Sequence, residues 1–330
     1  VPARAHRFCA ASSLPELRAA LRDLLQEDAQ PLVLGGGSNL LLAADPAQPV
    51  LCPALRGIEL ETLDADRVEL RAWAGEPWDG VVRAACAEGL WGIENLALIP
   101  GTAGAAPVQN IGAYGVELSD TLAWVDVIGL DSGEPLRLSA DQLGLGYRDS
   151  RFKREPRRWL VTRIGLRLTS SAAPRLDYAG LKDALAGRAH GALSPSEVAD
   201  TVRDIRRRKL PDPALLGNAG SFFKNPEIDE SRCAALQAAW PGLPVFPASA
   251  PGLRKLSAAW MIEQAGFKGI REGDAGVADT HALVLVNHGA ASGAELLALA
   301  RRVASGVEAR FGIALEPEPV IIGADFRECA

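Results

Sequence analysis

Residues 92–118 read GIENLALIPGTAGAAPVQNIGAYGVEL, in which glycine and alanine recur too often for an ordinary helix or strand. Pro100 fixes φ immediately before a glycine, which is a turn signal. Glycine has no Cβ, so it permits positive φ or close approach to another group. The stretch therefore predicts a loop built for close approach, and loops of this length inside compact domains are usually functional. Its glycines are Gly92, Gly101, Gly104, Gly112 and Gly115.

The polar residues of this loop carry no charge and favour a flat, partly apolar cofactor. Successive backbone N–H groups in such turns form a concavity that binds phosphate oxygens without lysine, and the stretch contains no lysine. Thr102, Gln109 and Asn110 can hydrogen-bond a heterocycle or a ribose and carry no charge. We expect a flat cofactor and no metal. The alternative is a surface loop that is rich in glycine only because it is a loop.

A second glycine loop follows a short apolar strand near the start of the chain. Residues 32–34 run into the sequence GGGSN at 35–39, and residues 40–42 resume the apolar run. The loop lacks the G-x-G-x-x-G spacing of a Rossmann site and the G-K-[ST] ending of a P-loop. Both common nucleotide fingerprints are therefore absent, and this loop by itself is a weak signal.

Length and charge narrow the class of protein. The chain has 330 residues, which exceeds what one hydrophobic core usually serves, so two or three domains are expected. Its 35 basic and 41 acidic residues give a net charge of −6. This charge provides no general attraction to nucleic acid or to an anionic membrane. An anionic substrate must then be held by local basic groups.

No pattern predicts a membrane span, a disulfide framework or a zinc site. The apolar runs are too short to span, and the first residues lack a signal-peptide pattern, so a cytoplasmic protein is expected. The chain begins at Val1 without methionine, and a few residues are expected to precede it. The cysteines form no C-x-x-C pair, which predicts reduced, partly buried thiols. They are Cys9, Cys52, Cys86, Cys233 and Cys329.

Apolar periodicity predicts the elements of the first half. Residues 13–16 (SLPE) form a capping box that precedes a helix. Residues 68–74 alternate at period two and predict a strand, which a helix over 79–89 follows. Residues 124–130 and 159–168 also alternate, which predicts a half-buried antiparallel sheet.

The second half begins with a capped basic helix. Residues 194–197 (SPSE) form a capping box, and the helix must end before Pro211. Its basic cluster either complements the helix dipole in solvent or, at a domain junction, binds a pyrophosphate. The sequence leaves both interpretations open. The cluster comprises Arg203, Arg206, Arg207, Arg208 and Lys209.

Helices and strands alternate beyond this helix, which predicts an α/β domain. A glycine stops a helix over 257–265, residues 281–287 predict a strand, and Ser292 with Glu295 cap another helix. The apolar residues 315–323 follow close behind, and we expect them to return to the middle domain.

Six ordered motifs carry a resemblance that covers nearly the whole chain. They are VLGGGSNLL, the stretch 92–118, GYRDSRFK, KLPDP, GNAGSFFKNP and LEPEP. In this order they closely resemble the UDP-N-acetylenolpyruvoylglucosamine reductase family, flavoenzymes of peptidoglycan precursor synthesis. The resemblance implies an α+β fold: two FAD-binding subdomains of the vanillyl-alcohol oxidase type and a third, α/β substrate-binding domain. The expected ranges are 1–57, then 58–208 with 314–330 returning to it, and 209–313.

The resemblance also implies the reaction. A hydride passes from NADPH through FAD to C3 of UDP-N-acetylglucosamine enolpyruvate, and a proton at C2 completes UDP-N-acetylmuramate. Neither glycine loop holds a histidine or cysteine, so non-covalent FAD is expected, and a monomer is expected. Two alternatives remain. Another FAD-dependent oxidoreductase would not need GNAGSFFKN or LEPE, and a non-catalytic nucleotide-sugar binding protein would lack the flavin site.

Three catalytic residues are implied, each with a structural alternative. Ser221 would protonate C2, or it is a turn residue beside two phenylalanines. Arg148 would bind a carboxylate with its planar fork, or it pairs with Asp149 at the surface. Glu318 would act with Arg148 in stabilising the developing charge, although a glutamate between two prolines is normally exposed. Position 319 is proline where the family pattern leads us to expect valine.

Further residues are implied to bind ligands. Tyr178 matches a tyrosine loop that folds over the nucleotide sugar in one subclass, and His281 is a binding residue or a structural histidine. The substrate-binding set is Tyr178, Lys209, Asn225 and His281. The cofactor-binding set is Gly35, Gly36, Gly37, Ser38, Asn39, Pro100, Gly101, Thr102, Gly104, Gln109, Asn110, Gly112, Ala113, Tyr114, Gly115 and Arg206.

Overall fold

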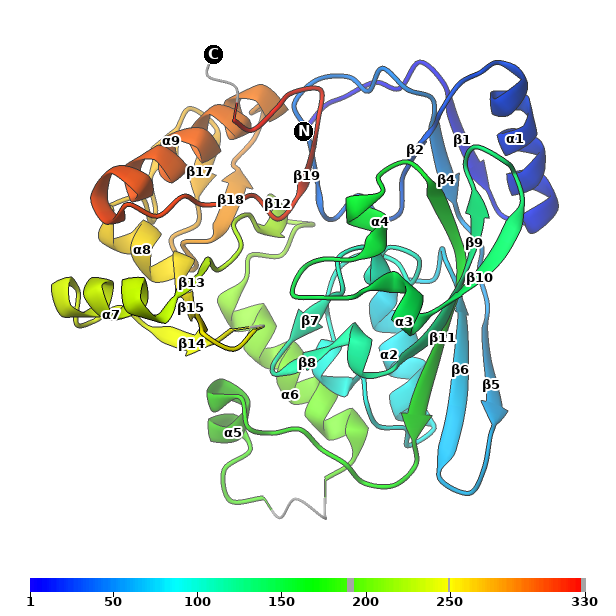
Figure 1. Cartoon of the computed structure of the whole chain (residues 1–330), viewed down its shortest axis with the longest axis horizontal. Helices are drawn as coiled ribbons and strands as arrows, with labels where there is room; N and C mark the ends of the chain where they lie inside the picture. Colours follow the sequence, from blue (N-terminus) through cyan, green and yellow to red (C-terminus); the bar gives the residue numbers. More distant parts are fainter. Residues whose placement is uncertain (189–192, 249, 328–330) are drawn as a thin grey trace. The chain divides into compact units, whose positions relative to one another are not determined.

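The computed structural model describes residues 1–188, 193–248 and 250–327 (Figure 1). The chain divides into two compact units. The N-unit comprises residues 5–37 and 48–206. The C-unit comprises residues 1–4, 38–47 and the described residues from 207 onward. The chain therefore changes unit inside the first glycine loop and again near the end of the basic helix.

The N-unit begins with a three-stranded parallel sheet in the order β1-β4-β2, beside helix α1 (Figure 1). Leucines at helical spacing bury one face of α1. The predicted capping box is displaced by one residue: Ser13 Oγ accepts from Glu16 N–H at 3.4 Å, but Glu16 accepts from the N–H of Ser12 at 2.9 Å. The bounds are β1 Phe8–Ala11, α1 Leu14–Gln26, β2 Leu32–Val33 and β4 Val50–Pro53.

A five-stranded antiparallel sheet, in the order β10-β9-β11-β6-β5, carries the main core of the N-unit. The predicted antiparallel pairing is confirmed. The prediction that β9 and β11 are half-buried is wrong, because both are interior strands covered on both faces. On one face Trp124 lies against Gly165 and beneath Arg137, whose Cζ is 3.7 Å from the ring centroid. The bounds are β5 Ile58–Thr62, β6 Arg67–Trp73, β9 Leu122–Gly129, β10 Pro135–Ser139 and β11 Trp159–Thr169.

Helices α2 (Trp78–Ala87) and α6 (Pro195–Lys209) bury apolar side chains in the same core. The capping box of α6 is confirmed, since Ser194 Oγ accepts from Glu197 N–H at 3.3 Å and Glu197 Oε2 accepts from Ser194 N–H at 2.9 Å. The long glycine loop contains only short elements, as predicted. The short elements of this unit are η1 Glu94–Leu96, η2 Ala106–Val108, β7 Gly112–Ala113, β8 Val116–Glu117, η3 Leu118–Asp120, α3 Ala140–Leu143, α4 Arg151–Arg154 and α5 Ala179–Ala184.

The C-unit has an antiparallel sheet in the order β12-β18-β17-β16, next to helices α8 and α9 (Figure 1). The capping box of Ser292 and Glu295 is confirmed. Ser257 also caps a helix, because its side chain accepts from Trp260 N–H. The strand expected from residue 281 begins at 284, because His281 makes a turn in which its carbonyl accepts from Val284 N–H. A second sheet has the order β13-β15-β14 beside α7. The bounds are β12 Gly217–Ser221, β13 Glu227–Asp229, α7 Glu230–Ala239, β14 Val245–Pro247, β15 Leu253–Leu256, α8 Ala258–Gln264, β16 Arg271–Glu272, β17 Ala275–Val277, β18 Val284–Asn287 and α9 Gly293–Phe311.

The segments 38–47 and 314–327 differ from the expected domain ranges. Strand β19 (Val320–Ile322) pairs in parallel with β3 (Leu40–Leu42), and both belong to the C-unit. Residues 314–327 therefore do not return to the range 58–208. The reason is local: two short apolar strands satisfy each other's backbone groups, and β3 also packs on α9.

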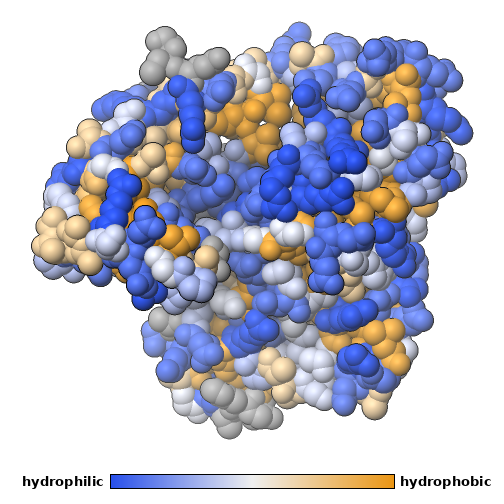
Figure 2. Space-filling view, in the orientation of Figure 1, coloured by the Kyte–Doolittle hydropathy of each residue, from blue (hydrophilic) through white to orange (hydrophobic). Residues whose placement is uncertain are grey.

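The visible surface is mainly hydrophilic (Figure 2), and the described cysteines form no disulfide. Hydrophilic side chains predominate on the face seen in Figure 2, with apolar patches between them. Cys9, Cys52, Cys86 and Cys233 are free thiols, and burial raises the pKa of Cys86 to about 12, which makes it unreactive. Cys329 lies outside the described residues. Within the described ranges, no helix is both long enough and apolar enough to cross a membrane.

Candidate active site

The two glycine loops meet in the N-unit. A Cβ on Gly35 would lie 2.8 Å from Thr102 Oγ1, and one on Gly36 would lie 3.2 Å from Gly101 Cα. Side chains at these positions would therefore push the loops apart. The two loops lie more than sixty residues apart in the sequence, yet their backbones approach each other closely. This cradle fits the pyrophosphate of a dinucleotide, which needs N–H groups at close range.

The start of helix α2 holds the cradle in place. Trp78 N–H donates to the carbonyl of Gly101 at 3.0 Å, Ala103 N–H donates to Glu76 at 2.8 Å, and Gly104 N–H donates to Ala74 at 2.9 Å. A Cβ on Gly104 would come within 2.6 Å of Ala74 Cβ. Residues 101–104 are thus fixed by backbone bonds before any ligand binds.

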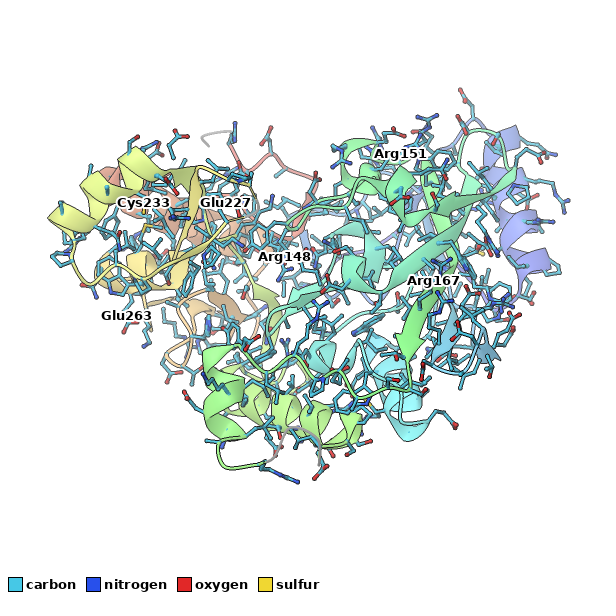
Figure 3. All side chains as sticks on the ribbon, turned by 60° about the horizontal axis from the view of Figure 1, so that its bottom comes forward. Arg148, Arg151, Arg167, Glu227, Cys233 and Glu263 are labelled. Atoms are coloured by element: carbon cyan, nitrogen blue, oxygen red, sulfur yellow. The ribbon has the colours of Figure 1, made fainter. Side chains whose placement is uncertain are left out.

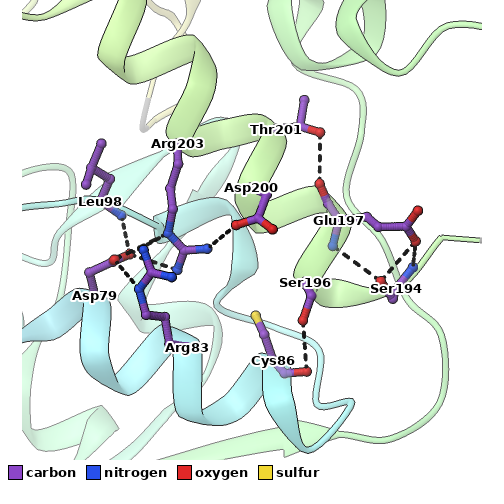
Figure 4. Close-up of polar contacts among 10 residues, drawn as sticks. All are labelled: Asp79, Arg83, Cys86, Leu98, Ser194, Ser196, Glu197, Asp200, Thr201 and Arg203. Atoms are coloured by element: carbon purple, nitrogen blue, oxygen red, sulfur yellow. Dashed lines mark hydrogen bonds and ion pairs between the residues drawn. The ribbon is translucent and has the colours of Figure 1, made fainter.

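A buried ion-pair network ties helix α6 to the same loop (Figure 4). Arg203, with a 4% exposed side chain, donates from Nη2 and Nε to Asp79 Oδ1 at 2.9 and 3.1 Å. The same Oδ1 accepts from Leu98 N–H at 2.7 Å, where Leu98 has a φ of 57°. Burial opposes the Asp79 charge, but the Arg203 and Leu98 bonds outweigh it and hold the pKa of Asp79 below its usual value. The network therefore places the residues that precede Pro100.

Side chains hold the second half of the long loop. Asn110 is buried; its Nδ2 donates to Glu117 at 2.8 Å and to the Gly146 carbonyl at 3.0 Å, and its Oδ1 accepts from Ser119 N–H at 2.9 Å. The expectation that this amide hydrogen-bonds a heterocycle or ribose is therefore replaced by a structural role. The amide is committed to protein partners in every direction.

Arg148 and Arg206 lie beside this part of the loop. Arg148 comes from the loop before α4, which begins at Arg151 (Figure 3), and donates from Nη2 to the Gly112 carbonyl at 2.7 Å. Asp149 forms an ion pair with Arg154. Burial lowers the pKa of Arg206, and the neighbouring Arg148 charge acts in the same direction. Two cations held this close favour an anionic ligand.

Tyr178 lies against the glycine loop through Tyr114. The ring centroids are 5.1 Å apart at an interplanar angle of 71°, and Tyr178 remains 48% exposed. Buried Asn95 joins the glycine loop to the segment that precedes Tyr178, because its Nδ2 donates to the carbonyls of Tyr114 and Arg175 at 2.9 and 2.8 Å. Arg175 also pairs with Asp120 at 2.6 Å. The half-exposed ring of Tyr178 is therefore carried on a segment that is tied to the loop.

In the C-unit, Ser221 and Glu318 lie on adjoining backbone segments. Ser221 ends β12 and pairs with Val284 of β18. The next residue, Phe222, donates its N–H to Leu283 at 2.7 Å and accepts from Glu318 N–H at 2.8 Å. The hydroxyl and the carboxyl of this pair are therefore carried by backbones that hydrogen-bond to each other.

Three predicted substrate-binding residues also belong to the C-unit. His281 Nδ1 accepts from Leu283 N–H at 3.3 Å, and burial, followed by Lys209 and Lys268, lowers the pKa of His281. The imidazole is thus neutral at physiological pH, in agreement with a structural role. Asn225 Oδ1 accepts from Ala258 N–H at 3.0 Å and so helps to cap α8.

The predicted site residues fall into two sets, one in each unit. The first glycine loop is divided between them, with residues 35–37 in the N-unit and residues 38–39 in the C-unit. Three residues that hold the loops were not predicted as site residues. Asp79 carried no motif, Asn95 lies in the stretch 92–118 without a predicted role, and Arg203 stood in the basic cluster three positions before Arg206. The C-unit contains Ser38, Asn39, Lys209, Ser221, Asn225, His281 and Glu318. The N-unit contains Gly35, Gly36, Gly37, Pro100, Gly101, Thr102, Gly104, Gln109, Asn110, Gly112, Ala113, Tyr114, Gly115, Arg148, Tyr178 and Arg206.

Comparison with known proteins first gives the class. The family model for an FAD binding domain matches residues 5–139, which include both glycine loops. The chain is therefore a flavoprotein, and the predicted α+β fold with an FAD-binding part is confirmed. A second model, for the C-terminal domain of UDP-N-acetylenolpyruvoylglucosamine reductase, matches residues 212–322.

Similar proteins then give the family. The UDP-N-acetylenolpyruvoylglucosamine reductase of Xanthomonas campestris pv. campestris (strain B100) is 51% identical over 96% of this chain and 89% of its own length. That of Xanthomonas oryzae pv. oryzae (strain KACC10331 / KXO85) is 52% identical over 89% and 87%. The crystal structure of the Thermus caldophilus enzyme matches with a TM-score of 0.64 and 26% identity, covering 96% of this chain and 91% of that one. The chain belongs to the UDP-N-acetylenolpyruvoylglucosamine reductase family, which confirms the resemblance.

Proposed function

We propose that this flavoenzyme uses NADPH to reduce the enolpyruvyl group of UDP-N-acetylglucosamine enolpyruvate, giving UDP-N-acetylmuramate for peptidoglycan synthesis. The relatives that share about half of its residues carry the corresponding name. The observation that carries the proposal is the hydrogen bond between Glu318 N–H and the Phe222 carbonyl, which joins the backbone that carries a carboxyl group to the backbone that carries the hydroxyl group of Ser221. A simple binding protein has no need of that pair.

The cradle would hold FAD without a covalent bond. Backbone amides of residues 35–37 and of Gly101 and Thr102 would bind the pyrophosphate, and Arg206 would add a positive charge near Tyr114. Bound FAD would accept the electrons of NADPH and supply the hydride. The protein's part is to bind, orient and exclude water.

Arg148, Glu318 and Ser221 would act on the substrate. An enol ether is electron-rich, so hydride addition at C3 requires its carboxylate to absorb negative charge. The guanidinium fork of Arg148 suits this carboxylate. Glu318 can assist only as a protonated carboxyl group that donates a hydrogen bond. Ser221 would then deliver a proton to C2.

Tyr178 and Lys209 would bind the nucleotide sugar. The half-exposed ring of Tyr178 supports the tyrosine-loop subclass, and the exposed Lys209 would meet a phosphate. Asn225 and His281 would shape the pocket through the contacts described above. We also propose a cytoplasmic monomer without nucleic-acid or membrane partners, because NADPH and nucleotide sugars are cytoplasmic metabolites.

Anaerobic half-reactions test the proposal. NADPH should bleach the flavin absorbance of the purified protein, and stoichiometric UDP-N-acetylglucosamine enolpyruvate should restore it. UDP-N-acetylglucosamine, which lacks the enolpyruvyl group, is the matched control and should leave the flavin reduced. Reoxidation by small carbonyl compounds alone would favour another oxidoreductase, and a colourless protein that binds the sugar would favour a binding protein.

A further inference from the structure

The backbone of Glu318 is held from two sides within the C-unit. Its N–H donates to the Phe222 carbonyl at 2.8 Å. Its carbonyl accepts from Nδ2 of Asn39 at 3.3 Å. Asn39 comes from the first glycine loop, where a cofactor contact is expected, yet its side chain reaches the chain 279 positions away.

These two bonds belong to a longer arrangement of three segments. On the Asn39 side, the Asn39 carbonyl accepts from Val320 N–H at 3.0 Å, and β3 continues in register with β19. On the other side, Phe223 bridges to Pro317, and Lys224 N–H donates to Glu316 at 3.0 Å. The segment that carries Glu318 is therefore the middle one of three.

Proline restricts this middle segment further. A residue that precedes proline is disfavoured in the α region, so Pro319 restricts the backbone conformations open to Glu318. Pro319 is buried, which leaves little freedom for the peptide between them. Because proline has no N–H, the peptide between Glu318 and Pro319 can hydrogen-bond through its carbonyl, and this carbonyl accepts from Asn39 Nδ2.

We propose that Asn39 and Pro319 are positioning residues that fix the backbone of Glu318 and thereby the direction of its carboxyl group. The inference rests on the proposed role of Glu318 in catalysis. It gives Asn39 a role in the second half-reaction, which is distinct from FAD binding. A fixed carboxyl group matters because a misplacement of about 1 Å can slow a reaction about a hundredfold.

The test separates the two roles of Asn39. Asn39→Ala and the uncharged, similarly sized Asn39→Leu, which both lose the Nδ2 donor, are compared with the wild type by stopped-flow absorbance and by FAD titration. We expect reoxidation of the reduced flavin by the enolpyruvyl substrate to slow roughly tenfold or more. Flavin reduction by NADPH and the Kd for FAD should stay within about twofold. Weaker FAD binding with equal slowing of both half-reactions, or no change at all, would overturn the inference.

Asn287→Ala is the matched control for lost stability. Its Nδ2 also donates to a backbone carbonyl in the C-unit, that of Ala291 at 2.8 Å, and it touches neither Ser221 nor Glu318. This variant should lower Tm and leave both half-reactions unchanged. If it slows reoxidation as much as Asn39→Ala does, the effect is general loosening and the inference fails.

A double-mutant cycle identifies the residue through which Asn39 acts. Asn39→Ala and Pro319→Val should be non-additive, because both release the same peptide. In a Glu318→Gln background, Asn39→Ala should add no further slowing; full additivity would overturn the inference. If Glu318→Gln alone leaves reoxidation at the wild-type rate, the catalytic assignment of Glu318 in the proposed function has failed instead.

Discussion

Where the two glycine loops approach each other in the N-unit, they offer a ligand backbone amides, whereas the region around Ser221 and Glu318 in the C-unit offers a hydroxyl and a carboxyl side chain. In the first region a ligand can approach because Cβ atoms are missing from Gly35 and Gly36. In the second, the hydrogen bond between Glu318 and Phe222 fixes the chain, and the chemistry resides in a hydroxyl and a carboxyl group. The first region should therefore lose its ligand when atoms are added, and the second should lose catalytic rate when functional groups are removed.

The largest effect is expected from Ser221→Ala. If the hydroxyl only protonates C2, the oxidative half-reaction should slow by roughly a hundredfold to ten-thousandfold. NADPH reduction of the flavin should stay near the wild-type rate, because that step takes no proton from this residue. Stopped-flow measurement of each half-reaction decides the point, and Ser221→Cys should recover part of the rate. Equal slowing of both halves would assign Ser221 to the shape of the pocket.

Removing the buried cation behind the glycine loop should have the next largest effect. Among the described residues, Arg203→Met leaves Asp79 with the exposed Arg83 as its cationic partner and should cost about 3 kcal/mol in the free energy of unfolding. The cradle should loosen with it, so the Kd for FAD should rise at a temperature where the protein is still folded. Arg83→Ala removes the exposed partner of the same carboxylate and should cost about 1 kcal/mol or less. Similar losses from both variants would contradict the network.

A smaller effect is expected from adding atoms to the cradle. Gly36→Val places a Cβ 3.2 Å from Gly101 Cα, and this overpacking should destabilise the folded cradle by about 1 to 3 kcal/mol. The loss should be seen as a lower FAD occupancy of the purified protein. Gly80→Ala, in α2, is the control, since its Cβ would have 3.9 Å to the nearest atom and alanine favours a helix. Full FAD occupancy in Gly36→Val would refute the close approach of the loops.

The smallest expected effect is a dependence of stability on pH from Asp79. Its pKa is lower in the folded protein than in the unfolded chain, so its contribution is complete above the unfolded pKa of about 3.9 and is lost as the pH falls through the folded pKa. Urea unfolding of the wild type and of Asp79→Asn should therefore give a stability difference that shrinks below about pH 4. A stability difference that stays constant as the pH falls well below about 4 would mean that the carboxylate charge is not what holds Leu98.

Sequence patterns predicted much of the fold because caps and periodicity are local. The capping boxes of Ser194 with Glu197 and of Ser292 with Glu295 could be predicted, since each joins residues three positions apart. The burial of β9 and β11 on both faces could not be predicted, because the second face is covered by the leucines of helix α1, which pack on Ile128 and Leu160, and by Arg137 over Trp124.

The sequence alone determined the family, the cofactor class and the identities of the candidate residues, because ordered motifs identify chemistry without coordinates. Tertiary structure alone decided which groups work together. It showed that Asn110 is committed to protein partners and that Asn39 reaches the carbonyl of Glu318. It also joined strands β3 and β19, which lie at opposite ends of the chain. Hydrogen bonds between residues far apart in sequence depend on the folded path of the backbone, and no local pattern records that path.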